Sequence, residues 1–262
     1  MSGIGGDELF AGYPTFLQYY KLQNATGVYK AVMPFRKLIA AFMKNSKTSR
    51  NQRLVSLLAL DDMSIWNMYP IMRSVLTPSY IKTFTHLDAH ASNLPSILKH
   101  EMMDAPKLGL FSEYSIAEYL GYTQNTLLKD ADQMSMAVGL EIREPFFDHE
   151  LVEYVLSIPD HIKFPMYPKQ LMVEALDPLL PKEIVNRPKQ GFLLPWDKWM
   201  RKELSSFCEK QLLSISERSI INKKELMTYW KRFLNNDSSV RWSELWLFVV
   251  LGYWMERNGV EG

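Results

Sequence analysis

The chain has 262 residues, enough for one large domain or two small ones, and its 47% apolar and 13% aromatic residues exclude general disorder. Thirty basic residues against 29 acidic ones leave a net charge of +1, which excludes the basic footprint of a nucleic-acid-binding protein. The single cysteine, Cys208, excludes an intramolecular disulfide framework and a cysteine-rich zinc site, and it favours a reducing compartment.

Helical periodicity dominates the first part of the chain. Apolar residues recur at steps of three and four between 28 and 42, and Pro34 is expected to break or kink that run. The pattern continues at 54–58 and at 65–69, where we expect Pro70 to interrupt it. Alternating runs of Val, Ile and Thr are scarce, so few strands are expected.

Helices are also predicted for most of the second part. One block covers 111–139, and Asp148 is predicted to cap the next helix because its carboxylate can accept from the free amides of the first turn. That helix should bury a stripe of Leu151, Val152, Val155 and Leu156. Three prolines between Ser157 and Pro168 predict a loop. Further helices are expected around 169–178, 196–213, 222–234 and 240–257.

The last of these helices is apolar almost all round and should lie in the core. The polar join Asn235–Ser239 is interpreted as a loop and not as a domain boundary. We therefore predict one mainly helical domain over residues 1–262.

The longest strongly apolar run, 245–255, is about half of the roughly 20 residues that a membrane helix needs. The first eight residues carry neither the basic start nor the apolar core of a signal peptide. These features predict a cytoplasmic protein with no membrane partner.

The first eight residues form the first candidate site. Gly3, Gly5 and Gly6 precede Asp7, and apolar residues follow, as in a loop that enters a helix. Glycines let backbone amides approach an anion, and a helix start favours negative charge. An acidic side chain directly after such a loop suits a divalent cation held against a phosphate. The alternative is a turn whose glycines only bend the chain.

The second candidate site is the segment 127–148. Its charged side chains stand among apolar ones, and buried charges need partners, so structural Arg–carboxylate pairing is as good an interpretation as a functional one. Its methionines are most simply core residues. The charged residues are Asp130, Asp132, Glu141, Arg143 and Glu144.

The third candidate site is the segment 186–192, where Lys189 stands two residues before a glycine. A mobile lysine there could close over a phosphate, although a solvated loop lysine is the more common case. His86 and His90 have a spacing found in metal sites, but no third ligand is evident, so no metal site is predicted there. Cys208 is interpreted as a small buried apolar group.

In this order and spacing, the three segments resemble the synthetase domain of the glutamine-dependent asparagine synthetase family. The resemblance is strongest at SGIGGDELFAGYPTF (2–16), at LLKDADQMSMAVGLEIREPFFDHELVEYV (127–155) and at RPKQGF (187–192). It implies that the chain is the mainly α, helical C-terminal part of an α/β ATP-pyrophosphatase domain, a fold similar to the adenine nucleotide alpha hydrolases.

The resemblance also implies a reaction and roles for individual residues. In this family ATP adenylylates a carboxylic acid, pyrophosphate leaves, and ammonia released from glutamine by a separate glutaminase domain or subunit attacks the acyl carbon. Lys189 matches a lysine that stabilises the leaving pyrophosphate or the adenylate phosphate. Ser2, Gly3, Gly5 and Gly6 match the nucleotide-binding positions, and Asp7 matches the residue that holds Mg²⁺. Glu8, Glu141 and Arg143 are interpreted as framework residues, and a homo-oligomer is possible.

Two features depart from the family pattern. Neither the glutaminase with its N-terminal cysteine nor the Ser-Gly-Gly-x-Asp-Ser pyrophosphate loop is found, so we expect the chain to be the C-terminal part of a larger enzyme. Ile4 stands where aspartate-amidating members carry Glu or Asp, and Asn125-Thr126 stands where many members are acidic. The alternatives are a relative that amidates another acid, such as a sugar uronate, or that closes a ring as β-lactam synthetases do, or a non-catalytic helical remnant that acts as a binding module.

Overall fold

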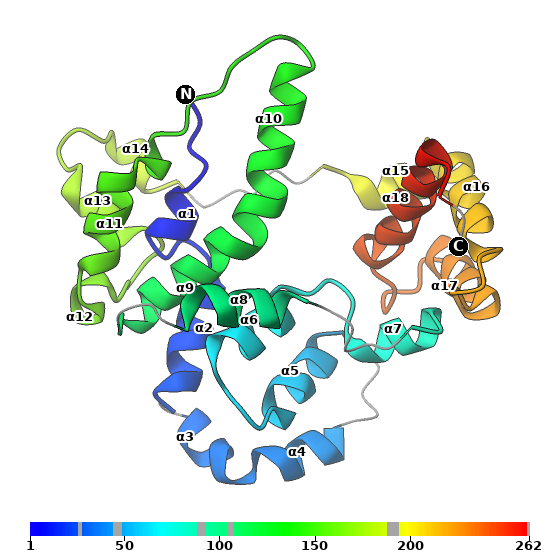
Figure 1. Ribbon diagram of the computed structural model, residues 1–262, viewed down its shortest axis with the longest axis horizontal. Coiled ribbons are helices and arrows are strands. Elements are labelled where there is room, and N and C mark those ends of the chain that lie inside the picture. Colours follow the sequence, from blue (N-terminus) through cyan, green and yellow to red (C-terminus); the bar gives the residue numbers. More distant parts are fainter. Residues whose placement is uncertain (26–27, 44–48, 88–92, 104–106, 188–193, 261–262) are drawn as a thin grey trace. The chain divides into compact units, whose positions relative to one another are not determined.

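The computed structural model describes residues 1–25, 28–43, 49–87, 93–103, 107–187 and 194–260. Within these ranges the chain is helical and forms no β-sheet; its one β-type pairing there is an isolated antiparallel bridge between Thr85 and Ile221 (Figure 1). The prediction of a mainly α protein is therefore confirmed, while the α/β fold of a complete synthetase domain stays a prediction.

The chain divides into two compact units. The first consists of Met1–Phe42, Ser56–Arg73 and Asn93–Pro188, and the second of Met43–Val55, Ser74–Ser92 and Lys189–Gly262. Helix α5 (Ser49–Ala59) has residues in both.

The first unit contains the helices that position the candidate site. They are α1 (Gly6–Leu9), α2 (Pro14–Gln23), α3 (Val28–Val32), η1 (Met33–Phe35), α4 (Arg36–Met43), α6 (Ile65–Arg73), α8 (Leu94–Met102), α9 (Leu110–Glu118), the π-helical segment η2 (Tyr119–Leu127), α10 (Leu128–Met136), η3 (Pro145–Phe147), α11 (His149–Ser157), α12 (Asp160–Lys163), α13 (Gln170–Ala175) and α14 (Lys182–Val185).

Helix α9 lies at the centre of this unit. It packs against α1, α2, α6, α11 and α12, and its small serine and alanine side chains let these neighbours approach on several sides. Aromatic rings from α2 and α9 fill the space between the two helices, with the Phe16 and Tyr114 ring centroids 4.6 Å apart. The site described below is built on this rigid centre.

The second unit is a separate helical core. Its helices are α7 (Pro78–Phe84), α15 (Trp196–Arg201), α16 (Ser205–Ser216), α17 (Lys223–Leu234) and α18 (Trp242–Asn258). Trp230 and Phe233 of α17 and Leu245 of α18 are buried in it. Cys208 is fully buried in the same cluster, as predicted for a small apolar side chain.

Local signals for helix ends were correct at two positions. The backbone tightens to the 3-10 helix η1 at Pro34, where a break was predicted. The Asp148 carboxylate caps α11 by accepting hydrogen bonds from the amides of Glu150 and Leu151, at 3.1 and 3.2 Å. The Asn235–Ser239 join has no helical structure, also as predicted.

Other expectations about helices were wrong. Helix α6 continues through Pro70 instead of ending there. The proline-rich stretch 157–168 is not all loop, because Pro159 precedes a short helix, α12, and proline suits a helix start. In α11 only Val155 of the predicted stripe is fully buried.

Two groups of apolar residues are more exposed than predicted. One side of α18 is open, with Trp254 53% exposed, so this helix is not buried all round. Met134 and Met136 of α10 are also exposed and are not core residues. Periodicity showed which side chains share a face but not whether another element covers that face.

In the part of the chain that the structure describes, no helix has both the length and the apolar character needed to cross a membrane.

Candidate functional site

The loop before α1 is shaped by Gly5, which has a backbone φ of +97°. This conformation is unfavourable for residues with a β-carbon. A β-carbon on Gly5 would also lie 2.9 Å from the Cβ of Phe146, closer than real contacts allow. The loop therefore needs glycine at this position for two independent reasons.

The amides of this loop bind to acceptors within the site. Ser2 donates its amide to the carbonyl of Arg143 at 2.7 Å, and Ile4 donates its amide to the Ser2 hydroxyl at 3.1 Å. The Gly5 amide donates to the Glu8 carboxylate at 3.1 Å. In this conformation the amide of Gly5 is used to hold the loop and not to bind a ligand.

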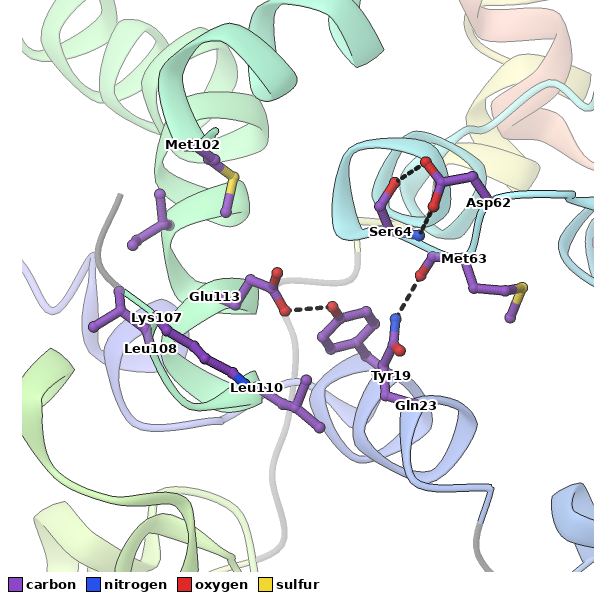
Figure 2. Close-up of a pocket in the computed structure, with 11 residues that line it drawn as sticks. Tyr19, Gln23, Asp62, Met63, Ser64, Met102, Lys107, Leu108, Leu110 and Glu113 are labelled. Atoms are coloured by element: carbon purple, nitrogen blue, oxygen red, sulfur yellow. Dashed lines mark hydrogen bonds between the residues drawn. The ribbon is translucent and has the colours of Figure 1, made fainter. Parts of the chain in front are cut away.

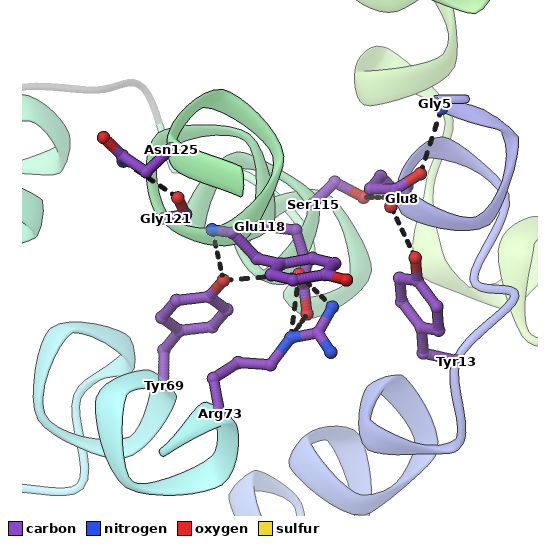
Figure 3. A network of polar contacts seen from close by, with 10 residues as sticks. Gly5, Glu8, Tyr13, Tyr69, Arg73, Ser115, Glu118, Gly121 and Asn125 are labelled. Carbon is purple, nitrogen blue, oxygen red and sulfur yellow. Dashed lines mark hydrogen bonds and ion pairs between the residues drawn. The ribbon is translucent and has the colours of Figure 1, made fainter. Parts of the chain in front are cut away.

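Glu8 is the centre of the loop's anchor (Figure 3). Its side chain is 1% exposed, and its second carboxylate oxygen accepts a hydrogen bond from the Tyr13 hydroxyl at 2.6 Å. The hydroxyl of Ser115, on α9, donates to the Glu8 carbonyl at 2.8 Å. The prediction that Glu8 is a framework residue is confirmed.

The first two candidate segments lie together. Besides the bond from Ser2 to Arg143, the ring of Phe146 lies against the loop and meets the ring of Phe10 at a centroid distance of 5.9 Å. Segments that are about 140 residues apart in sequence thus lie side by side.

The charged residues of the second segment are mostly at the surface. Asp130, Asp132, Glu141 and Arg143 are exposed, so they need no buried partner. Arg143 does form an ion pair with Glu141 at 2.9 Å, and both side chains are more than 70% exposed. The pairing interpretation was correct, but the expected burial was wrong.

Asp7 faces a cation that the sequence analysis missed. Lys169 lies 3.2 Å from the Asp7 carboxylate, and both side chains are about one-quarter exposed. Lys169 stands directly before α13 in a left-handed backbone conformation. No sequence signal connected these residues, because they are 162 positions apart.

The family resemblance assigns Mg²⁺ binding to Asp7, and this role stays a prediction. Among the described residues, no group of three or more His, Cys, Asp or Glu side chains is arranged to bind a metal ion. Mg²⁺ is commonly bound by one or two carboxylates, substrate phosphates and water, so a single carboxylate fits that mode and not an all-protein cage. Lys169 beside it adds a second positive charge suited to phosphate.

A buried ion pair lies under the anchor of the loop. Arg73 donates to the Glu118 carboxylate at 2.5 to 3.0 Å, and the Glu118 side chain is fully buried. Burial raises the pKa of the Glu118 carboxyl, and the hydrogen bonds from Arg73 oppose that shift. The Arg73 guanidinium also lies over the ring of Tyr13, at 4.6 Å, which links the pair to the Glu8 anchor.

The same network holds the π-helical segment η2. The Tyr69 hydroxyl accepts a hydrogen bond from the Tyr122 amide at 3.0 Å and donates to Glu118 at 3.3 Å. The side-chain amide of Asn125 donates to the carbonyls of Leu120 and Gly121, at 2.9 Å each. π-Helical turns are often found at functional sites, and here the widened turn adjoins the loop's supports.

Lys189, the predicted catalytic residue, falls outside the described residues, and Arg187, at the end of the described range, is exposed. His90, for which no metal site was predicted, also falls outside the described residues.

Comparison with known proteins identifies the family. The family model described as "Asparagine synthase" matches residues 1–256. Asparagine synthetase (glutamine-hydrolyzing) 1 of Bacillus subtilis is 22% identical over 262 residues, covering 98% of this chain and 40% of that protein. A putative asparagine synthetase of Mycobacterium bovis is 26% identical over 217 residues, covering 77% of this chain and 30% of that protein.

A shorter match with higher sequence identity covers one segment. The asparagine synthetase of Cricetulus griseus is 44% identical over 66 residues, which is 24% of this chain and 12% of that protein. No solved structure matches. The chain thus spans 40% or less of the length of these curated relatives, and it belongs to the asparagine synthase family.

Proposed function

We propose that this chain is the C-terminal part of an ATP-dependent amidotransferase of the asparagine synthetase type. The complete enzyme adenylylates a carboxylic acid, releases pyrophosphate and forms an amide with ammonia taken from glutamine. The relatives' names support an amidotransferase that uses glutamine. The cytoplasm is the proposed location.

One observation carries this proposal: the glycine loop and the 143–147 segment form a single structure. The bond from Ser2 to Arg143 and the contact of Gly5 with Phe146 unite the two longest strings that resemble the family. A β-carbon on Gly3 would meet nothing within 4 Å, so the backbone there is accessible to a ligand. A fixed, glycine-lined loop beside a carboxylate and a lysine suits a magnesium-bound phosphate.

The proposed roles follow from this arrangement. Ser2 and Gly3 would contact the nucleotide, and Gly5 and Gly6 would give the loop its shape. Asp7 would hold Mg²⁺, which neutralises phosphate charge when bound. Lys189 would stabilise the negative charge that develops on the leaving pyrophosphate.

The proposed partner is a polypeptide that supplies the glutaminase and the pyrophosphate-binding loop. The relatives are more than twice as long as the matched region, which supports a further polypeptide. Apolar side chains at and after the end of α10 are also exposed by 55–77%: Met134, Met136, Val138 and Leu140.

The acceptor acid forms the second part of the proposal. Ile4 stands in the loop between two glycines and offers no charge or acceptor, unlike the carboxylate of aspartate-amidating members. We therefore infer an acceptor other than aspartate, such as a sugar uronate. A helical remnant without catalysis is the competing hypothesis.

The test is reconstitution. The chain is mixed with the part of the Bacillus subtilis relative that precedes the matched region, and pyrophosphate release is measured with Mg-ATP, ammonia and a panel of carboxylic acids. We expect release that depends on one acid in the panel and that is lost in Asp7→Asn. A stable complex without release for any acid would favour the remnant.

The isolated chain provides the matching control. We expect no glutamine hydrolysis and no micromolar affinity for Mg-ATP in calorimetric titration, because we propose that the glutaminase and half of the phosphate site belong to another polypeptide. Micromolar binding by this chain alone would contradict the division of the site that we propose.

A further inference from the structure

A cavity of about 500 Å³ lies in the first unit, on the opposite side of α9 from the glycine loop. Ser115 of α9 contacts the loop through the Glu8 carbonyl, whereas Glu113 lines the cavity. Residues two apart on an α-helix point to nearly opposite sides, so the two sites are distinct. Nothing in the proposed amidation reaction uses this cavity.

Glu113 is the key polar group of the cavity (Figure 2). It is half-buried and accepts a hydrogen bond of 2.5 Å from the hydroxyl of Tyr19, whose side chain is 1% exposed. Burial raises the pKa of the Glu113 carboxyl; the bond from Tyr19 opposes this shift, and the charge of Asp160 adds to it. Among the described residues no cation forms an ion pair with Glu113, so its charge is only partly compensated.

The other polar groups of the cavity differ from Glu113. The Asp62 carboxylate accepts hydrogen bonds from the amide of Ser64 and the side chain of Asn67, at 2.9 Å each, so its own turn satisfies it. Lys107 is exposed and lies on the same side of the cavity as Glu113 in Figure 2, across from Asp62 and Ser64. With two carboxylates against one lysine, the cavity favours a cationic group over an anion.

The walls between these groups are apolar. Met63, Met102 and Leu110 line the cavity and leave room for a short hydrocarbon body. Methionine side chains adapt to ligands of irregular shape. The cavity therefore combines a partly compensated carboxylate, an apolar surface and an exposed lysine.

We propose that this cavity binds a small aliphatic compound with a primary ammonium group. The ammonium donates to the free lone pairs of Glu113, and the aliphatic body lies against Met63 and Met102. A simple alkylamine and an apolar amino acid share this chemistry. An amino acid would in addition place its carboxylate toward Lys107.

The experiment follows the methionine methyl groups by NMR in the intact chain, with isoamylamine, L-leucine and isovalerate as probes. We expect saturable shifts of the Met63 and Met102 methyls with isoamylamine and none with isovalerate, which has a similar body and the opposite charge. Tighter binding of L-leucine, abolished in Lys107→Gln, would identify the amino acid as the better source of the ammonium group. Equal affinity for isoamylamine and L-leucine would show that the ammonium group and the aliphatic body are sufficient for binding.

Variants test the position of the ammonium. Glu113→Gln should weaken isoamylamine binding about tenfold or more, the usual range for losing a charged hydrogen bond. Glu101→Gln removes the same charge from an exposed site on α8 and should leave affinity unchanged. Met63→Trp should fill part of the cavity and block isoamylamine binding. If Glu113→Gln does not fold, this variant tests whether the amine binds in the cavity. Absent shifts, or unchanged affinity in Glu113→Gln, would overturn the proposal.

Discussion

Gly5 and Phe146 approach so closely that a methyl group on Gly5 would lie 2.9 Å from the Phe146 β-carbon. The two residues belong to strings that are about 140 residues apart in sequence. Their contact ties the shape of the glycine loop to the position of the 143–147 segment. The loop is consequently held by a tertiary contact and is not an isolated turn.

Gly5→Ala should destabilise the protein by about 2–4 kcal/mol, because it adds left-handed backbone strain and a steric clash. Gly139→Ala is the matched control: Gly139 also has a positive φ, +68°, but a β-carbon there would meet nothing within 4 Å. It should cost only about 1 kcal/mol. Urea unfolding of both variants measures the difference, and equal losses would mean that the Phe146 contact does not matter.

Arg73→Met should destabilise the protein by about 3–5 kcal/mol, since it leaves the buried Glu118 carboxylate without its cation. Lys210→Met, which breaks the exposed pair with Glu256, should cost less than about 1 kcal/mol. Chemical denaturation at pH 7 measures the free energy of unfolding of both variants. A similar small loss in both variants would show that the buried pair contributes little.

The loss in Arg73→Met should also depend on pH. Burial raises the pKa of Glu118, and without Arg73 this pKa rises further above its unfolded value. The folded variant then binds a proton that the unfolded chain releases, so the loss should shrink as pH falls from 7 toward 5. A loss that is constant over this range would contradict the role given to Glu118.

Lys163 gives a pH dependence of the opposite kind. It is buried, its ammonium contacts Ser112, and burial lowers its pKa from 10.5 to about 8, although Asp160 opposes the shift. Between these two values the unfolded chain binds more protons than the folded protein, so this group makes the free energy of unfolding increase with pH.

Lys163→Met should therefore lose this increase. Between pH 7.5 and 9.5, the wild-type free energy of unfolding should rise relative to that of the variant by about 2 kcal/mol. The exposed Lys202→Met should follow the wild type at every pH. Parallel curves for Lys163→Met and wild type would show that the Lys163 pKa is not lowered.

Lys189→Ala should reduce pyrophosphate release by the reconstituted enzyme about a hundredfold or more and leave glutamine hydrolysis largely intact. A lysine that contacts only the developing charge affects the chemical step and not the separate glutaminase. Lys182→Ala, at an exposed position of α14, is the control. Near-normal release in Lys189→Ala would make this residue an ordinary loop lysine.

Aspartate should be a poor acceptor for the reconstituted enzyme, because Ile4 supplies neither charge nor acceptor in the loop. Ile4→Glu alone should not restore aspartate activity fully, since Asn125 donates to helix carbonyls where many members are acidic. Pyrophosphate release with a panel of acids measures this. Aspartate as the best acceptor with Ile4 in place would refute the interpretation of this position.

Features that depend on neighbours in sequence were predictable. The cap at Asp148 and the break at Pro34 involve only hydrogen bonds and sterics within one helical turn. The family was also predictable, because three strings in a set order are specific even when each one alone is not.

Most of the wrong predictions concern the exposure of apolar side chains. Met134 and Met136 were predicted in the core and are exposed. Apolar side chains are expected to be buried, but their burial depends on which other element covers that face of the helix. This chain covers only 40% of the Bacillus relative, so elements that it does not contain are not seen here. The prediction that Pro70 ends a helix was wrong for a related reason: packing of α6 in the core outweighs the local cost of proline.

The sequence by itself determined the helical class, most helix positions and the family, because periodicity, capping and motif strings are all local. Only the tertiary structure decided the partners of the charged residues. Asp7 meets Lys169 across 162 positions, and Glu118 meets Arg73 across 45. Such pairs depend on where the chain returns after many turns, and charge or spacing along the sequence carries no record of that return.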